Sequence, residues 1–99
     1  MYVIREVLRC RPGKVRPMLD KFKALGKSMQ ELGHTPFRLL TDFSGEPFWT
    51  LVAETEVENV EDFMALEATL MADPAVGQIM SGYHDLVEQG RREIYRVER

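Results

Sequence analysis

The sequence predicts one α+β domain whose elements follow the order strand, helix, strand, strand, helix, strand. Two patterns predict it: apolar and polar residues alternate over several short segments, and apolar residues recur every three to four positions over two longer segments. A length of 99 residues, 44% of them hydrophobic, fits one core of this size. We therefore interpret residues 1–99 as a single domain.

The first half of the chain predicts a strand, a helix and a hairpin. Residues 2–10 mix β-branched, aromatic and charged side chains in near alternation, which indicates a strand. Residues 14–32 carry one apolar stripe at helical spacing, and Gly33 is the expected end of that helix. Residues 37–43 and 48–56 are predicted as two strands joined by a short connection that contains glycine and proline.

The second half predicts a broken helix and a final strand. Asn59 is a good N-cap, and Asp73-Pro74 restarts the helix with the aspartate as cap and the proline in the first turn. We expect the restarted helix to run to Gly90 and residues 92–97 to form the last strand. This order is the ferredoxin-like βαββαβ plan, an antiparallel four-stranded sheet with both helices on one face.

The predicted strands carry apolar residues on both of their sides. In residues 2–10, Ile4 and Leu8 share one side, whereas Val3 and Val7 share the other. A sheet with one side in water alternates apolar and polar residues, so we expect the second face to be covered. An identical chain is the simplest cover, which predicts a homodimer through the sheet faces. The alternative is a monomer with a few exposed apolar residues.

Charge is segregated along the chain, although the net charge is only −3. Residues 1–38 hold nine Lys/Arg and three Asp/Glu, residues 39–90 hold eleven acids and no Lys or Arg, and the last nine residues hold four Arg and two Glu. We expect most of this segregation to cancel, on the interpretation that the first and third strands run parallel and bring Glu54, Glu56 and Glu58 beside the basic residues. The pI of 5.4 argues against nucleic acid or a membrane surface as partner.

Composition also excludes other classes of protein. No apolar run approaches the ~20 residues of a membrane span, and charges near the N-terminus do not favour a signal peptide. The single cysteine, Cys10, excludes an intrachain disulfide framework, so we expect a cytoplasmic protein. With two histidines and no Cys-x-x-Cys motif, we expect no metal site.

Five short segments of the chain are similar to a known superfamily: residues 2–6, 12–14, 37–42, 57–63 and 92–95. Together with the element order, they resemble the dimeric α/β-barrel superfamily, and the NIPSNAP-like proteins and antibiotic-biosynthesis-type monooxygenases within it. The resemblance implies a homodimer with sheets packed face to face and a small apolar pocket between each sheet and its helices. Members include cofactor-independent monooxygenases, haem-degrading enzymes, isomerases and lyases.

His84 is the candidate catalytic residue. It falls on one row of the predicted last helix with Val76, Met80 and Val87, so we expect its ring at the sheet side of a pocket or at its rim. A histidine there could act as a general base or a haem ligand, because its pKa lies near the working pH. The alternative is a packed histidine bonded to a backbone carbonyl.

Three aromatic residues, Tyr83, Trp49 and Tyr95, are candidate walls of the same pocket. The alternative for each is ordinary core packing, which is the commoner role of aromatic residues at strand and helix periods. A cleft lined by His84, Tyr83 and Trp49 would support the catalytic interpretation.

A basic cluster lies where the first strand passes into the first helix: Arg9, Arg11, Lys14 and Arg16. Four cations beside a helix N-terminus could hold a phosphate or carboxylate, and the alternative is compensation by nearby glutamates. Cys10 lies between two of these arginines, which would lower its pKa if it were exposed, whereas a lone cysteine at a strand end is more often inert packing.

Three hypotheses for function follow. The first is a homodimer that binds an apolar small molecule and transforms it by monooxygenase, isomerase or lyase chemistry, without a cofactor and with His84 as acid or base. The second is a non-catalytic binding or assembly module whose pocket is filled by its own side chains. The third is a haem-binding protein.

Overall fold

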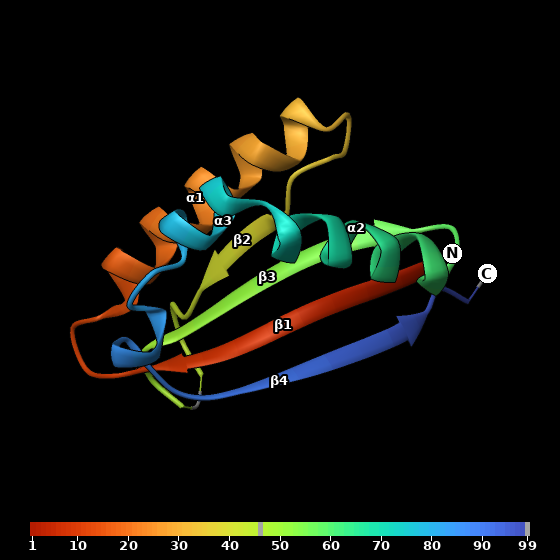
Figure 1. Cartoon of the computed structure of the whole chain (residues 1–99). Coiled ribbons are helices and arrows are strands. Elements are labelled where there is room, and N and C mark those ends of the chain that lie inside the picture. The colour runs from red at the N-terminus through yellow and green to blue at the C-terminus, as the bar shows by residue number, and fades with distance from the viewer. Residues whose placement is uncertain (46, 99) are drawn as a thin grey trace.

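Four antiparallel strands form one sheet in the order β2-β3-β1-β4. The computed structural model describes residues 1–45 and 47–98. The strands are β1 (Tyr2–Cys10), β2 (Arg38–Thr41), β3 (Thr50–Val57) and β4 (Val87–Arg96); the helices are α1 (Val15–Glu31), α2 (Val60–Ala72), α3 (Pro74–Ile79) and the short 3-10 turn η1 (Tyr83–Asp85). The predicted ferredoxin-like α+β fold is confirmed (Figure 1).

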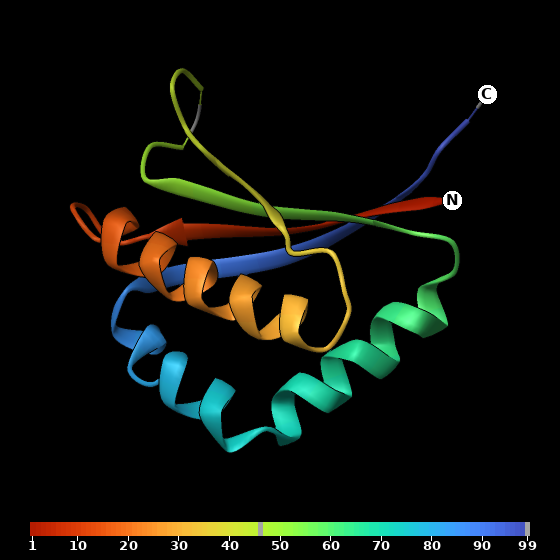
Figure 2. The same ribbon diagram turned by 90° about the horizontal axis from the view of Figure 1, so that it is seen from above.

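The helices cover one face of the sheet, and no described helix or strand covers the other (Figure 2). On the covered face Ile4 of β1 and Leu51 of β3 are fully buried. Met18 and Met29 of α1 are buried with them, as are Leu66 and Leu70 of α2. The core therefore lies between the sheet and the helices, and the residues of opposite parity along each strand form an open face.

The predicted starts of α2 and α3 are confirmed. The Asn59 side chain accepts a hydrogen bond from the backbone N–H of Asp62 at 2.9 Å. The Asp73 side chain accepts one from the N–H of Ala75 at 2.9 Å, and Pro74 occupies the first turn of α3. Each cap satisfies an amide that has no partner within its helix, so α2 begins after Asn59 and α3 begins after Asp73.

Replacing the cap residue Asn59 by alanine should lower the free energy of unfolding by about 1 kcal/mol, because the amide of Asp62 loses its acceptor. Urea unfolding followed by circular dichroism measures this difference. Asn59→Ser is the matched control, since serine also caps well. Equal losses in both variants would show that the side-chain cap contributes nothing.

The predicted last helix is wrong beyond Ile79. The chain turns at Gly82, which has a φ of +79°, and β4 then begins at Val87, five residues before the predicted strand. Gly90, the predicted helix end, lies inside β4 opposite Leu8. A Cβ at position 90 would meet Leu8 Cδ2 at 3.0 Å, so this glycine makes room for a core side chain.

The hairpin strands are shorter at the connection than predicted. β2 covers Arg38–Thr41 rather than residues 37–43, and β3 begins at Thr50 rather than at residue 48. Trp49 has a φ of +65°, which interrupts the extended backbone just before β3.

The expected compensation of the basic cluster by Glu54, Glu56 and Glu58 is wrong, because the first and third strands are antiparallel; Glu54 pairs instead with Arg5, in the middle of β1. Arg9 lies opposite Thr50, whereas Tyr2 lies opposite Val57. Glu54, Glu56 and Glu58 therefore extend away from the basic cluster at the C-terminal end of β1. Neighbouring strands in a fully antiparallel sheet always place unlike ends together.

Candidate functional site

An apolar pocket of about 480 Å³ lies between the sheet and the helices. Its walls come from β1, α1, the segment before β2, α2 and α3, and its apolar lining includes Leu8, Phe22, Leu25, Phe37, Phe63, Leu66, Leu70, Val76 and Met80. This volume falls in the ~300–1,000 Å³ range of small-molecule sites. The lining is suited to an apolar ligand.

Three phenylalanines form one wall of this pocket. The rings of Phe22 and Phe37 meet edge to face with centroids 6.2 Å apart, and Phe37 meets Phe63 in the same way at 6.4 Å. Such contacts hold each ring in one orientation. The wall is therefore built by residues from three separate segments that meet only in the folded chain.

Three charged side chains also line the pocket. Arg92 of β4 donates from Nε to Glu6 Oε1 at 2.5 Å and from Nη2 to Glu67 of α2, and its guanidinium lies 5.1 Å from the Phe63 ring centroid. Burial lowers the pKa of Arg92, but the hydrogen bonds to Glu67 and Glu6 outweigh it and raise that pKa above its usual value. This acidic triad of Glu6, Glu67 and Arg92 carries a net charge of −1 with its carboxylates ionised.

Glu6 and Arg92 were not among the residues predicted from the sequence. A signal for Glu6 exists, because it is the polar residue on the side of β1 that otherwise carries Ile4, Leu8 and Cys10. Its pairing with Arg92 follows from the register between β1 and β4, where the two residues are direct partners.

The predicted residues Tyr83 and His84 lie together in η1, and Tyr83 lines the apolar pocket. Their ring centroids are 4.0 Å apart. His84 is exposed and lines a neighbouring hollow, which shares Glu6, Leu8, Tyr83 and Arg92 with the pocket. His84 therefore lies beside the pocket, and not on the helical row predicted for it, because α3 ends at Ile79.

Trp49 and Tyr95 lie away from this pocket, which corrects the expectation that they share a cleft with Tyr83. Trp49 precedes β3 and lines a separate hollow with Gly13 and Arg16. Tyr95 belongs to the open face, where the Arg5 guanidinium lies 5.4 Å from its ring centroid. The register of β4 puts Tyr95 opposite Val3, on the side of the sheet without helices.

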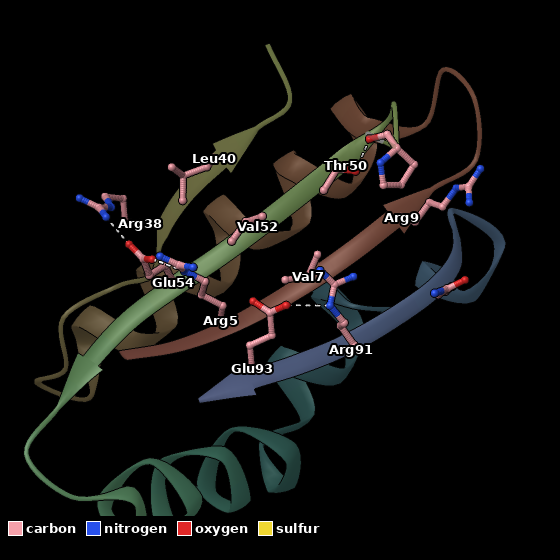
Figure 3. Close-up of a pocket in the computed structure, with 12 residues that line it drawn as sticks. Arg5, Val7, Arg9, Arg38, Leu40, Thr50, Val52, Glu54, Arg91 and Glu93 are labelled. Atoms are coloured by element: carbon pink, nitrogen blue, oxygen red, sulfur yellow. Dashed lines mark hydrogen bonds and ion pairs between the residues drawn. The ribbon is translucent and has the colours of Figure 1, made fainter. Parts of the chain in front are cut away.

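The open face holds a larger hollow of about 740 Å³ (Figure 3). Its floor is apolar, with Val7, Val52 and Leu40, and its rim carries four arginines and two glutamates. Glu54, which is only 7% exposed, accepts from Arg5 Nε at 2.6 Å and from Arg38 Nη2. These hydrogen bonds lower the pKa of Glu54, although burial opposes them.

Solved structures with the same fold include a NIPSNAP family protein of unknown function from Agrobacterium tumefaciens, at a TM-score of 0.84 and 21% identity over 100% of this chain and 89% of that one. A NIPSNAP-like domain protein from Burkholderia xenovorans matches at 0.76 and 20% identity, over 98% of this chain and 84% of that one. The chain shares the fold of these two NIPSNAP proteins.

The same fold is found in a protein from Deinococcus radiodurans that is provisionally described as an antibiotic biosynthesis monooxygenase. It matches at a TM-score of 0.70 and 12% identity, over 100% of this chain and 94% of that one. The sequence matches no protein-family model and no curated protein. The predicted resemblance is thus confirmed for the fold.

In this fold the basic cluster does not form one site. Arg9 extends from the open face, where its Nε lies 3.6 Å from Glu88 Oε2, whereas Arg16 lines the hollow beside Trp49. Lys14 and Arg11 lie in the turn between β1 and α1. The cluster is therefore divided between two surfaces.

Cys10 is 1% exposed and packs in the core, which confirms the packing interpretation, and burial raises the pKa of its thiol. Within residues 1–45 and 47–98 no group of three or more His, Cys, Asp or Glu side chains is arranged to hold a metal ion. No helix in the same residues is long and apolar enough to cross a membrane.

Proposed function

We propose that the chain is a small-molecule-binding protein that holds a neutral, largely apolar ligand in the pocket between its sheet and its helices. The apolar lining of this 480 Å³ pocket is the observation that carries the proposal. A neutral ligand is favoured because the acidic triad has a net negative charge and would repel an anion. The Tyr83 hydroxyl and the triad supply the polar contacts that would orient the ligand.

The proposal includes a homodimer packed through the open faces. Val7 and Val52 support it, because they lie opposite each other on a face that no described helix covers. Size-exclusion chromatography with light scattering at ~10 μM tests the dimer. A chain that stays monomeric at this concentration has a dimer Kd well above the micromolar range. A monomer at that concentration would contradict it.

A cytoplasmic location is part of the same proposal, supported by the lone buried Cys10.

Cofactor-independent oxygenation is a second candidate, favoured by the provisional description of the Deinococcus radiodurans neighbour. Its test is oxygen consumption with hydroxylated aromatic substrates. His84→Ala separates two versions of the chemistry: a loss of turnover would assign His84 as the base, whereas full activity would leave Tyr83 and Glu6 as the groups that contact substrate. No turnover with any substrate would favour a non-catalytic binding module.

Haem does not fit this pocket well. The commonest protein ligand of haem is an imidazole, and others are a thiolate, a thioether or a phenolate. His84 lies on the neighbouring hollow and Cys10 is packed in the core, so the pocket itself offers only the weaker methionine and tyrosine ligands, Met71, Met80 and Tyr83. We therefore expect no change in the haem absorption spectrum on titration with the protein. A shifted Soret band would overturn this assignment.

Filling the pocket through Gly77 tests the proposed ligand site. Gly77 lies in α3, lines the pocket, and a Cβ built on it meets nothing within 4 Å. Gly77→Leu should weaken binding of the neutral fluorescent probe N-phenyl-1-naphthylamine by at least about tenfold. The variant should also stay as stable as the native chain or more so, because leucine is the better helix former.

Ala75→Leu is the matched control, since Ala75 lies in the same helix, is exposed and does not line the pocket. Probe binding should survive in this variant. Equal probe binding in the native chain and in Gly77→Leu would place the ligand elsewhere and contradict the proposal.

A further inference from the structure

The hollow on the open face has a surplus of positive charge. Among the described residues that line it, four arginines (Arg5, Arg9, Arg38 and Arg91) stand against two acids (Glu54 and Glu93), which leaves two positive charges. Glu56 also belongs to the open face of β3, but it lies opposite Val3 and outside the hollow. The surplus therefore belongs to the part of the face nearer the C-terminal end of β1.

The pairing of these side chains shows where the surplus lies. Arg5 and Arg38 share the single carboxylate of Glu54, and Arg91 pairs with Glu93 at 2.8 Å. Among the residues that the structure describes, the one ion pair of Arg9 is the 3.6 Å contact with Glu88, which does not line the hollow. The side chains of Arg9, Arg38 and Arg91 are 50%, 74% and 58% exposed, so their guanidinium groups are accessible from the open side.

Packing two open faces together would bring two hollows of the same sign into contact. Like charges that lose water on association repel, and this repulsion costs more as the interface dries. A planar guanidinium binds the two oxygens of a carboxylate or phosphate well, and several around one hollow can share an oxyanion.

We propose that the open-face hollow is an oxyanion site, held by Arg9, Arg38 and Arg91, whose occupation strengthens the homodimer. The inference rests on the proposed dimer. The ligand is a phosphate or carboxylate group, and the apolar floor of Val7, Val52 and Leu40 accommodates an apolar body attached to it. This site is on the opposite side of the sheet from the proposed pocket for the neutral ligand.

Sedimentation velocity with the full chain tests the inference. The dimer dissociation constant is measured at pH 7 in sodium chloride, in inorganic phosphate and in benzoate, all at one ionic strength. We expect it to fall at least about tenfold in ~20 mM phosphate or benzoate, because an anion that binds only the dimer shifts association by mass action. The anion with the larger effect identifies the class of oxyanion.

The double variant Arg9→Gln/Arg91→Gln removes the surplus of two charges. Its dimer should be tighter than the native dimer in chloride and should not respond to either anion. A merely structural role for the arginines would weaken the dimer in every buffer. Arg16→Gln is the matched control, because Arg16 is an exposed cation that does not line the hollow and its variant should respond as the native chain does.

Besides a double variant whose dimer is weaker in every buffer, three results would overturn the inference. A native dimer of equal strength in all buffers would remove the anion site and leave the dimer intact. A monomer in all buffers would remove both. An equal response in the double variant would assign the effect to general salting-out rather than to the arginines.

Discussion

Leu51→Ala is expected to lower the free energy of unfolding by about 2–5 kcal/mol, the range for truncating a fully buried leucine. Leu51 is 0% exposed in the central strand β3, where it lies between Leu8 and Thr41 and packs into the core beneath the helices. In a chain of 99 residues a loss of this size lowers the Tm by about 10 °C or more. Calorimetry and urea unfolding measure both quantities.

Val52→Ala is the matched control, because Val52 is the next residue of the same strand but belongs to the open face. It is half-buried, so its truncation should cost about 1 kcal/mol in the monomer. The two variants should also differ in their effect on the proposed dimer. The Val52 variant should weaken the proposed dimer, whereas the Leu51 variant acts on the core of each copy. Equal losses would contradict the division of the sheet into a core face and an open face.

The elements that could be predicted from the sequence are those governed by neighbouring residues. Asn59 caps an amide three positions away, Asp73 caps one two positions away, and Gly33 adopts the positive φ that follows the end of α1. These interactions are local, so a short segment contains all the information needed.

The helix after Ile79 was predicted wrongly because two patterns coincide there. Val76 and Met80 continue with Val87 at helical spacing, although Val87 begins β4. Gly82 is the signal that could have divided them, since its positive φ is a conformation that glycine adopts without strain. The predicted position of His84 followed from the longer helix. The structure places His84 in the turn η1 instead.

The charged residues of the two sites could not be predicted because their partners are set by register. Glu6 is opposite Arg92 on one side of the sheet, and Glu54 is opposite both Arg5 and Arg38 on the other. Sequence alone shows alternating charge in each strand, but a shift of one residue in pairing would move every side chain to the other face. The apolar residues on both faces were predicted correctly from alternation.

Glu54→Gln should lower the free energy of unfolding by about 1–3 kcal/mol at pH 7, because the buried carboxylate accepts charge-assisted hydrogen bonds from Arg5 and Arg38. The full cost of breaking a buried ion pair is not expected, since both arginine side chains remain partly exposed. Glu93→Gln is the control: Glu93 is paired with Arg91 on the same face, but it is more exposed and should change stability less. Urea unfolding of the three proteins measures the differences.

Acid should remove the advantage of the native chain over Glu54→Gln. Hydrogen bonds from Arg5 and Arg38 lower the pKa of Glu54 below that of the unfolded chain, which is about 4.3. The stabilisation is therefore fully present above that value and is lost as the pH falls through the lower pKa of the folded state. The difference between the two proteins should be constant from neutral pH to about pH 5 and should shrink below about pH 4. A difference that persists undiminished at the acid end would show that the shape of the glutamate, and not its charge, holds the two arginines.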